Sequence, residues 1–323
     1  MHHQPLFGRL SSPAPVTSSP PSSALLSRRA LLCSGAAALP WLAGCATPLP
    51  LGVQPTGGAG SPAAIAGAAR LRESAEVHGL VAYRKLRDIN VAYDGLWRPL
   101  IDSIQPLVVD KAYRGSSQER LMPAAGINAQ SYRGTAGNKQ VVWRRGSGDT
   151  QGEVAVWFNG QRSKDPAVAA ACALVAEGYG LFLLGPLWLA DRGLPAELAG
   201  RERVNGRACD VVHTWLRPGF GFAPQDRVAL CIDRDDGITR RVRFTLEGTE
   251  STQGAVAEVD TFEHQRRFGV LWPLHSYEEV VHPLRLPAHD WHLTGLDVNR
   301  GYEASALQGP QFSGLAVAPA AAL

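Results

Sequence analysis

Residues 226–248 read DRVALCIDRDDGITRRVRFTLEG, and this stretch holds the pattern that decides the fold. The turn sequence Asp235-Asp236-Gly237 divides it into two halves that are rich in apolar residues. In the second half apolar side chains alternate with arginine and threonine, which is the period of a strand with one buried face. The stretch therefore predicts two consecutive strands, over 225–233 and 238–247, with a tight turn between them.

Similar patterns recur on both sides of this stretch, at spacings near ten residues and with turn sequences between them. One of these turns, Asn159-Gly160, is the strongest short signal for a β-hairpin. Spacing of this kind indicates an antiparallel meander, a sandwich or a barrel. The further predicted strands are 88–97, 152–159, 203–217, 254–262, 268–272, 276–281 and 291–298.

The segment 165–191 interrupts the strands with a helical pattern. Asp165 is the expected N-cap, and Pro166 is the expected first helical residue. A helix of small residues follows, and we expect the glycines Gly178 and Gly180 to end it.

Leu181–Leu189 is the densest apolar stretch of this segment. Glu177, the neighbouring glycines and Gly185-Pro186 break the apolar run, which argues against a transmembrane helix. Two interpretations stay open: the stretch packs against the sheet as core, or it forms a lid over a hydrophobic cavity.

Residues 1–44 have the order of an export signal, with a paired arginine, a short apolar run and then small residues. Ser27-Arg28-Arg29-Ala30-Leu31-Leu32 resembles the twin-arginine export motif, and Leu42-Ala43-Gly44-Cys45 resembles the bacterial lipobox. The lipobox implies cleavage before Cys45, acylation of that cysteine, as with palmitate, and an anchor that does not span the membrane. By the same resemblance Ala46 favours the outer membrane. The alternative is an uncleaved N-terminal anchor.

The positive charge of the chain lies in this leader. The sequence holds 32 basic and 29 acidic residues, a formal charge of +3. Residues 1–44 contain three arginines and no acidic residue, so the remainder is neutral, with 29 of each sign. Because phosphate binding needs a basic surface, we expect no nucleic-acid partner.

Composition divides the rest of the chain into three parts. Residues 45–71 are dominated by Pro, Gly, Ala, Ser and Thr, which predicts a flexible tether. Residues 311–323 are rich in alanine and uncharged, which predicts a disordered tail. The folded domain is therefore expected over 72–310, with the helical and apolar insert 165–191 inside it.

The layout of residues 75–300, a long antiparallel meander interrupted by helix and apolar loop in an exported chain, resembles the LolA/LolB-like superfamily. Local similarity lies in 156–160 (VWFNG), 206–212 (GRACDVV) and 226–248. The resemblance implies a mainly β fold with a helical cap, in which the sheet forms an incomplete, unclosed β-barrel. It also implies binding of lipids or lipoproteins in that barrel.

We therefore expect a lipid-anchored periplasmic protein that binds or transports a lipid or an acylated ligand in an apolar cavity, without catalysis or a cofactor. Cys45 would attach it to the membrane, and the sequence names no protein partner. The alternatives are an exported metal-dependent hydrolase and a structural envelope lipoprotein with no ligand. Large apolar side chains of the predicted elements are the candidate cavity wall: Phe182, Leu183, Trp188, Trp215, Phe244 and Trp272.

The hydrolase alternative rests on histidines that gather late in the sequence. Their spacing matches no familiar zinc signature, and His289 and His292 would face opposite sides of a strand, so we expect no metal site. Adjacent Glu278 and Glu279 would also face opposite sides and are expected to be solvated. The chain has no nucleophile elbow, phosphate loop or dinucleotide fingerprint. The late histidines are His264, His275, His282, His289 and His292.

Three cysteines, Cys172, Cys209 and Cys231, fall within the predicted domain. If the strands around 218–222 form a hairpin with Arg217 opposite Ala223, then Cys209 lies opposite Cys231. This register would permit a disulfide in the oxidising periplasm, and two buried free thiols are the alternative. Cys172 is expected to be a small buried residue of the helix.

Overall fold

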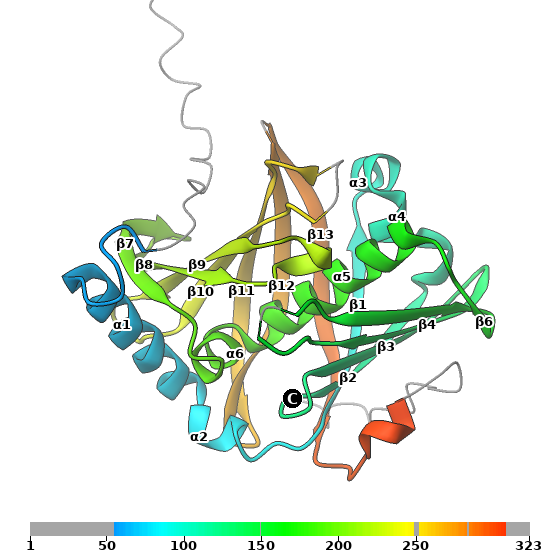
Figure 1. The fold of residues 1–323 in the computed structure, drawn as a ribbon, viewed down its shortest axis with the longest axis horizontal. Helices are drawn as coiled ribbons and strands as arrows, with labels where there is room; N and C mark the ends of the chain where they lie inside the picture. The colour runs from blue at the N-terminus through cyan, green and yellow to red at the C-terminus, as the bar shows by residue number, and fades with distance from the viewer. Residues whose placement is uncertain (1–54, 149, 249–251, 283, 308–323) are drawn as a thin grey trace, which may run out of the picture. The chain divides into compact units, whose positions relative to one another are not determined.

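The computed structural model describes residues 55–148, 150–248, 252–282 and 284–307. Their strands form one antiparallel sheet in the order β6-β5-β4-β3-β2-β1-β13-β12-β11-β10-β9-β8-β7. Consecutive strands pair in two series, β1 to β6 and β7 to β13, and the pairing of β1 with β13 joins the series. Because β6 and β7 do not pair with each other, the sheet stays open (Figure 1), which confirms the predicted mainly β, unclosed architecture.

The strands are β1 (Ile89–Trp97), β2 (Ser116–Met122), β3 (Ile127–Gly134), β4 (Gly137–Arg144), β5 (Glu153–Phe158), β6 (Gln161–Arg162), β7 (Ala196–Val204), β8 (Arg207–Leu216), β9 (Asp226–Asp233), β10 (Thr239–Thr245), β11 (Val256–Arg267), β12 (Val270–His282) and β13 (Leu284–Val298). The α-helices are α1 (Pro62–His78), α2 (Leu80–Tyr83), α3 (Pro99–Ile104), α4 (Pro106–Val109), α5 (Pro166–Leu184) and α6 (Pro186–Asp191). Short 3-10 turns are η1 (Lys111–Tyr113), η2 (Phe220–Phe222) and η4 (Ala304–Leu307).

The period-two pattern assigns the two faces of the sheet. In β10, Val242 and Phe244 point inward and join the main core together with side chains of α5. Arg241 and Arg243 alternate with them and point outward. The inner face is therefore apolar and covered by helix α5, while the outer face is charged.

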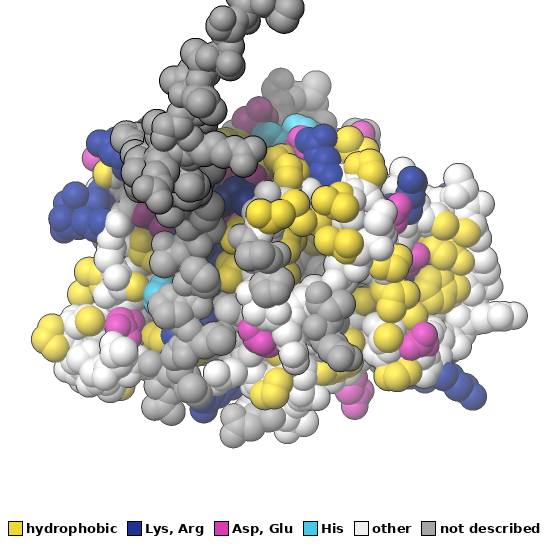
Figure 2. Space-filling model, turned by 90° about the horizontal axis from the view of Figure 1, so that it is seen from above, with side chains coloured by type: hydrophobic (Ala, Val, Ile, Leu, Met, Phe, Trp, Pro, Cys, Tyr) yellow, Lys and Arg dark blue, Asp and Glu magenta, His cyan; other side chains and the backbone are white. Residues whose placement is uncertain are grey.

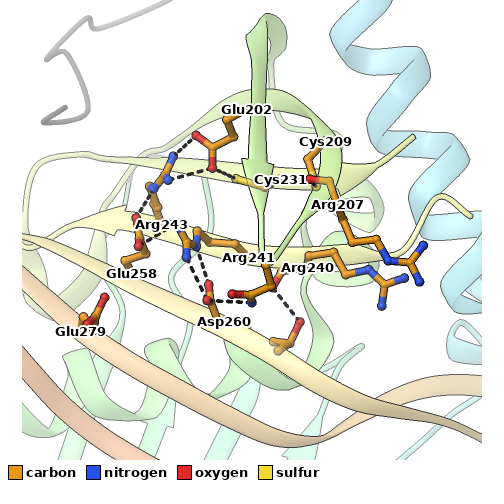
Figure 3. A network of polar contacts seen from close by, with 12 residues as sticks. Glu202, Arg207, Cys209, Cys231, Arg240, Arg241, Arg243, Glu258, Asp260 and Glu279 are labelled. Atoms are coloured by element: carbon orange, nitrogen blue, oxygen red, sulfur yellow. Dashed lines mark hydrogen bonds and ion pairs between the residues drawn. The ribbon is translucent and has the colours of Figure 1, made fainter. Parts of the chain in front are cut away.

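Ion pairs cover the outer face of β7 and β10 to β13. Figure 3 shows Arg243 between Glu202 and Glu258, and the distance between its Nη1 and the Glu202 Oε2 is 2.7 Å. Arg241 bonds both Asp260 and Glu258, with 2.8 Å between its Nη1 and the Glu258 Oε1. The side chain of Glu258 is 4% exposed, and it also pairs with Arg285 of β13, so it bonds arginines on two strands.

Helix α5 begins where the sequence predicts. The side chain of Asp165 accepts a hydrogen bond from the amide of Ala167 at 2.8 Å, and Pro166 opens the helix. The prediction that Gly178 and Gly180 end the helix is wrong, because α5 continues to Leu184. Every residue from Ala171 to Leu184 is buried, and this burial outweighs the low helix propensity of glycine.

Helix α5 is long and apolar enough to cross a membrane, and within the described ranges no other helix is. In this fold, however, 78% of its apolar window is buried among other elements. Helix α6 follows α5 and packs against α1. The stretch Leu181–Leu189 spans the end of α5 and the start of α6, and most of its side chains belong to the main core.

Helix α1 occupies part of the predicted tether. Ser61 caps it by accepting a hydrogen bond from the amide of Ala64 at 3.1 Å, and the helix packs on β7 and α6. Leu71 is buried in the main core, and the Ser74 hydroxyl donates to the carbonyl of Gly237. The predicted tether 45–71 is therefore wrong from Pro62 onward, because small residues can bury a helix face without an obvious apolar stripe. The predicted leader 1–44, Cys45 and the tail 311–323 lie outside the described residues.

Strand predictions agree best where apolar residues alternate. The predicted strands 88–97, 152–159, 225–233 and 238–247 match β1, β5, β9 and β10. The range 203–217 was predicted as one strand and is divided by the turn Asn205-Gly206 into β7 and β8. Strands β11 and β13 extend beyond 254–262 and 291–298, and the predictions 268–272 and 276–281 both fall on β12.

The sequence analysis does not predict β2, β3 and β4. These three strands bury polar side chains where a strand of the main core buries apolar ones: Glu119, Gln130 and Lys139 are at most 2% exposed. Their pattern therefore lacks the alternation that marks the other strands.

The predicted opposition of Cys209 and Cys231 is wrong. The hairpin closes with Leu216 opposite Asp226, so Cys209 faces Asp233 and Cys231 faces Val211. The observed pairing of β8 with β9 is therefore shifted by two residues from the predicted pairing. Both cysteines are buried free thiols, as is Cys172, which was expected to be buried.

Candidate functional site

An apolar cavity of about 120 Å³ lies between α5, the pair α3–α4 and the inner face of β10 to β13. An apolar cavity of roughly this size can hold a benzene-sized molecule without water. Three separate parts of the chain build the wall, so the cavity exists only in the folded domain. Its apolar lining is Trp97, Ile101, Ile104, Val108, Leu174, Val175, Phe182, Phe244, Leu246, Ala255, Val280 and Leu286.

The short helices α3 and α4 form the mouth of this cavity. Ile104 lines the cavity and is also 47% exposed, so the cavity reaches the surface beside it. Leu100 and Leu107, on the same two helices, are 52% and 44% exposed. Figure 2 shows hydrophobic side chains gathered on the face seen from above. A group of exposed apolar side chains around one opening is typical of a binding surface rather than of a surface that contacts only water.

Two residues of the cavity lining, Trp97 and Tyr179, belong to a group of stacked aromatic rings. The ring of His289 stacks on Trp97 with a centroid distance of 4.2 Å and on Trp291 at 4.7 Å. The ring of Tyr179 on α5 stacks on Trp291 at 5.6 Å. Burial and the charge of Arg114 hold the pKa of His289 well below its usual range, so its imidazole is neutral at physiological pH.

Glu278 is the acidic residue of the lining. It lies on β12, opposite Val259 of β11 and His289 of β13, and is 7% exposed. Within the described part of the chain its carboxyl group has no hydrogen-bond or ion-pair partner. Burial raises the pKa of Glu278 to about 8, so the neutral acid is the stable form below that pH. A neutral carboxylic acid can both donate and accept a hydrogen bond inside an apolar cavity.

A half-buried arginine holds the mouth helix α4 in position. Arg114 donates hydrogen bonds to the carbonyl oxygens of Val108 and Val109, both at 3.1 Å, where α4 ends. Its guanidinium lies over the ring of Tyr132, 4.1 Å from the centroid, and 5.8 Å from the centroid of Tyr179. Carbonyl groups at a helix end need such donors, so this contact fixes one side of the cavity mouth.

The structure places two of the six predicted wall residues, Phe182 and Phe244, in the cavity wall. Leu183 and Trp272 are buried in the main core without lining the cavity, and Trp188 lines a smaller one of about 40 Å³. Trp215 alternates with the inward Leu216 and lies near Arg227 instead. Contrary to the prediction, Leu183, Trp215 and Trp272 line neither of these two cavities, because side-chain size predicts burial but not which surface a side chain faces.

The late histidines separate onto the two faces of the sheet. His289 points inward, whereas His275 and His292 lie on the outer face beside Asp290. His264 contacts the ring of His78 elsewhere, and the side chain of His282 is outside the described set. The adjacent Glu278 and Glu279 face opposite sides as predicted, but the expectation that Glu278 is solvated is wrong.

Sequence reasoning missed the contribution of α3 and α4 to the site. The run Trp97-Arg98-Pro99-Leu100-Ile101 places a tryptophan and apolar residues around a helix-opening proline, which is the signal that could have found it. Glu278 was considered only as half of a carboxylate pair. An acidic residue on the inner side of an apolar strand is the feature that distinguishes it.

No family model matches the chain, and no curated protein matches it. Among solved structures, the chain is similar to a DUF1329 family protein from Desulfovibrio piger, with a TM-score of 0.48, 11% identity, and coverage of 77% of this chain and 100% of that one. It is similar to a putative outer membrane lipoprotein-sorting protein domain from Vibrio parahaemolyticus, with a TM-score of 0.39, 10% identity, and coverage of 76% and 97%. It is also similar to a LolA superfamily protein from Nitrosomonas europaea, with a TM-score of 0.38, 9% identity, and coverage of 77% and 98%.

Proposed function

We propose that this chain is an envelope lipoprotein that binds a lipid or another hydrophobic ligand in the cavity between α3–α4 and α5, without catalysing a reaction. The observation that carries the proposal is the apolar, aromatic-walled cavity whose mouth is marked by the half-exposed Ile104. A binding pocket of this type is mostly apolar and holds few polar groups.

The driving force for such binding is the removal of apolar surface from water. Each methylene group of an acyl chain that enters the cavity contributes about 0.8 kcal/mol. The present cavity of about 120 Å³ holds a short part of such a chain. Helix α3 has six residues, and a helix this short is not stable alone, so α3 can shift relative to the anchored α4 to admit more of the ligand.

Glu278 supplies the polar contact that orients the ligand. As a neutral acid without a protein partner it can bond to a hydroxyl or carbonyl oxygen of an otherwise apolar molecule. A ligand that makes this bond satisfies a buried group, whereas a pure hydrocarbon leaves it unsatisfied.

The proposed location is the periplasmic side of the outer membrane, with the domain held there by acylated Cys45. The lipobox-like sequence and the twin-arginine-like leader support this part of the proposal. The exposed leucines of α3 and α4 would then meet acylated molecules near the membrane surface.

The test is native mass spectrometry of the full chain, purified under mild conditions from an exporting host, with organic extraction of the same sample. We expect a bound lipid in the wild-type protein. Ile104→Arg places a charge at the cavity mouth and should abolish lipid retention. Its matched control is Ile65→Arg, because Ile65 is 62% exposed on α1 and does not line the cavity. A wild-type protein that carries no extractable lipid, or equal retention in both variants, would contradict the proposal.

A further inference from the structure

We infer that His275, Asp290 and His292 form a binding site for a divalent transition-metal ion of the zinc class on the outer face of the sheet. This site lies across the sheet from the cavity and is independent of the proposed function. It also departs from the expectation, drawn from sequence spacing, that the late histidines hold no metal.

Strand pairing brings the three ligands together. His275 of β12 lies directly opposite His292 of β13, and the two rings stack with a centroid distance of 4.3 Å and an interplanar angle of 15°. Asp290 precedes His292 by two residues and so shares its face of the strand. One ligand atom from each residue can be chosen so that all three lie within 4.8 Å of one another.

The distances fit a small cation with little movement. The Nε2 of His275 lies 2.8 Å from the Asp290 Oδ1, and the Nε2 of His292 lies 3.9 Å from the same oxygen. Ligands about 2.0–2.1 Å from a tetrahedral zinc ion are separated by about 3.3 Å. The two observed distances bracket this separation, so small side-chain rotations would bring the three ligands to it.

Neighbouring side chains restrict the orientation of the ligands, and one of them adds negative charge. Asp94 of β1 lies opposite His292 in the register and adds a second carboxylate to the same row of side chains. The ring of Phe262 stacks on His275 at 5.1 Å and restricts its orientation. Arg98 approaches the other oxygen of Asp290, with 3.7 Å between its Nη2 and Oδ2, which leaves Oδ1 directed at the histidines. Mixed imidazole and carboxylate ligands suit zinc, and three of them leave a fourth position for water.

The surface position of the cluster makes the site accessible. The side chain of His292 is 54% exposed, and those of Asp290 and His275 are 32% and 23% exposed. An ion can therefore enter from solvent without any movement of the backbone. Substitution of His292 leaves the core undisturbed, because 54% of its side chain is already exposed to water.

The experiment is equilibrium dialysis of the chelator-treated full chain against Zn²⁺, with metal analysis of the protein. We expect His275→Ala and His292→Ala each to remove one bound ion per chain, or to weaken its binding at least tenfold. Asp290→Asn, which keeps the shape of the side chain but removes its charge, should also weaken binding. The control is His213→Ala, which changes a partly buried histidine of β8 outside the cluster. This variant should bind Zn²⁺ as the wild type does.

Melting curves of the metal-free variants distinguish a lost ligand from a damaged fold, and Asp290→Asn serves as the reporter if an alanine variant does not fold. A wild-type chain that binds no Zn²⁺ would overturn the inference. So would wild-type stoichiometry and affinity in folded His275→Ala and His292→Ala. Lipid retention would be unaffected by any of these outcomes, so failure of the metal site and failure of the proposed function are distinguishable.

Discussion

Glu278 is the cavity residue whose ionisation is opposed by burial. Its carboxyl group is buried among apolar side chains and has no partner in the described chain, so burial raises its pKa from 4.5 to about 8. The folded state then binds a proton that the unfolded state has already lost between these two pH values. The contribution of Glu278 to stability is therefore fully present below pH 4.5 and is lost as the pH rises towards 8.

The first prediction follows from this loss of stability with rising pH. Glu278→Gln cannot ionise, so its free energy of unfolding should exceed that of the wild type by an amount that grows between pH 5 and pH 8. The limiting slope is about 1.4 kcal/mol per pH unit. Urea denaturation at pH 5, 6.5 and 8 measures the difference.

The matched control is Glu279→Gln, because Glu279 lies on the outer face in an ion pair with Arg285. Its difference from the wild type should not grow with pH in this way. A constant difference for Glu278→Gln would show that the carboxyl of Glu278 is solvated or paired in the folded state.

The cysteines give a second prediction at the residue scale. Burial raises the pKa of Cys209 to about 11 and that of Cys231 well above its usual range, so neither forms the reactive thiolate in the folded protein. We expect both thiols, with Cys172, to resist alkylation under native conditions and to react fully in denaturant without reductant. Mass spectrometry counts the alkyl groups, and a loss of two of them that reductant restores would indicate a disulfide.

At the scale of elements, α1 shows how a segment of low complexity becomes structural. It carries few large apolar residues, but Leu71 and Ala75 are buried in the main core, and the hydroxyl of Ser74 bonds to the carbonyl of Gly237 at 2.8 Å. The helix lies along β7 at the edge of the sheet (Figure 1). Gly67 of α1 lies against the backbone of Glu197, so α1 covers part of this edge strand, which hinders pairing with another chain there.

The third prediction distinguishes a docked helix from a tether. Leu71→Ala should lower the free energy of unfolding by about 2–5 kcal/mol, because it leaves a cavity in the core. Ile65→Ala on the same helix should change it by less than about 0.5 kcal/mol, because Ile65 is 62% exposed. Chemical denaturation measures both. Equal, small effects would mean that residues 62–78 do not pack on the sheet.

At the scale of the described domain, one sheet separates two chemical environments. Its inner face carries the apolar core and the cavity, and its outer face carries the ion-pair network around Glu258 and the histidine row of β12 and β13. The two faces use alternate residues of the same strands. A change on one face can therefore be tested with little effect on the other when the sites share no side chain.

The fourth prediction concerns the stability of the domain with ligand bound. An amphiphile such as 1-dodecanol, which has one hydroxyl group for Glu278, should raise the melting temperature of the delipidated protein in a concentration-dependent way. A free ligand concentration of 100 times the dissociation constant adds about 2.7 kcal/mol to the free energy of unfolding. Differential scanning calorimetry measures the shift. Ile104→Arg should show little shift, and an equal shift in this variant would place the amphiphile outside the cavity.

The sequence by itself determined the elements whose pattern is local. Alternation of apolar residues in 226–248, the hairpin signal Asn159-Gly160 and the N-cap Asp165 all correspond to elements of the structure. These patterns are readable because each depends on residues within one strand, one turn or the first turn of one helix. They were sufficient to predict an antiparallel, mainly β architecture with a helical insert.

The tertiary structure alone decided what depends on contacts between distant segments. The hairpin register that separates Cys209 from Cys231 depends on the conformation of its connection, and the docking of α1 depends on a strand more than a hundred residues away. Phe182 and Phe244 face the cavity while Trp272 does not, a distinction that residue type cannot express. The cavity and the histidine pair His275–His292 arise where separate segments meet, because burial and strand register are properties of the folded chain and not of any one stretch of sequence.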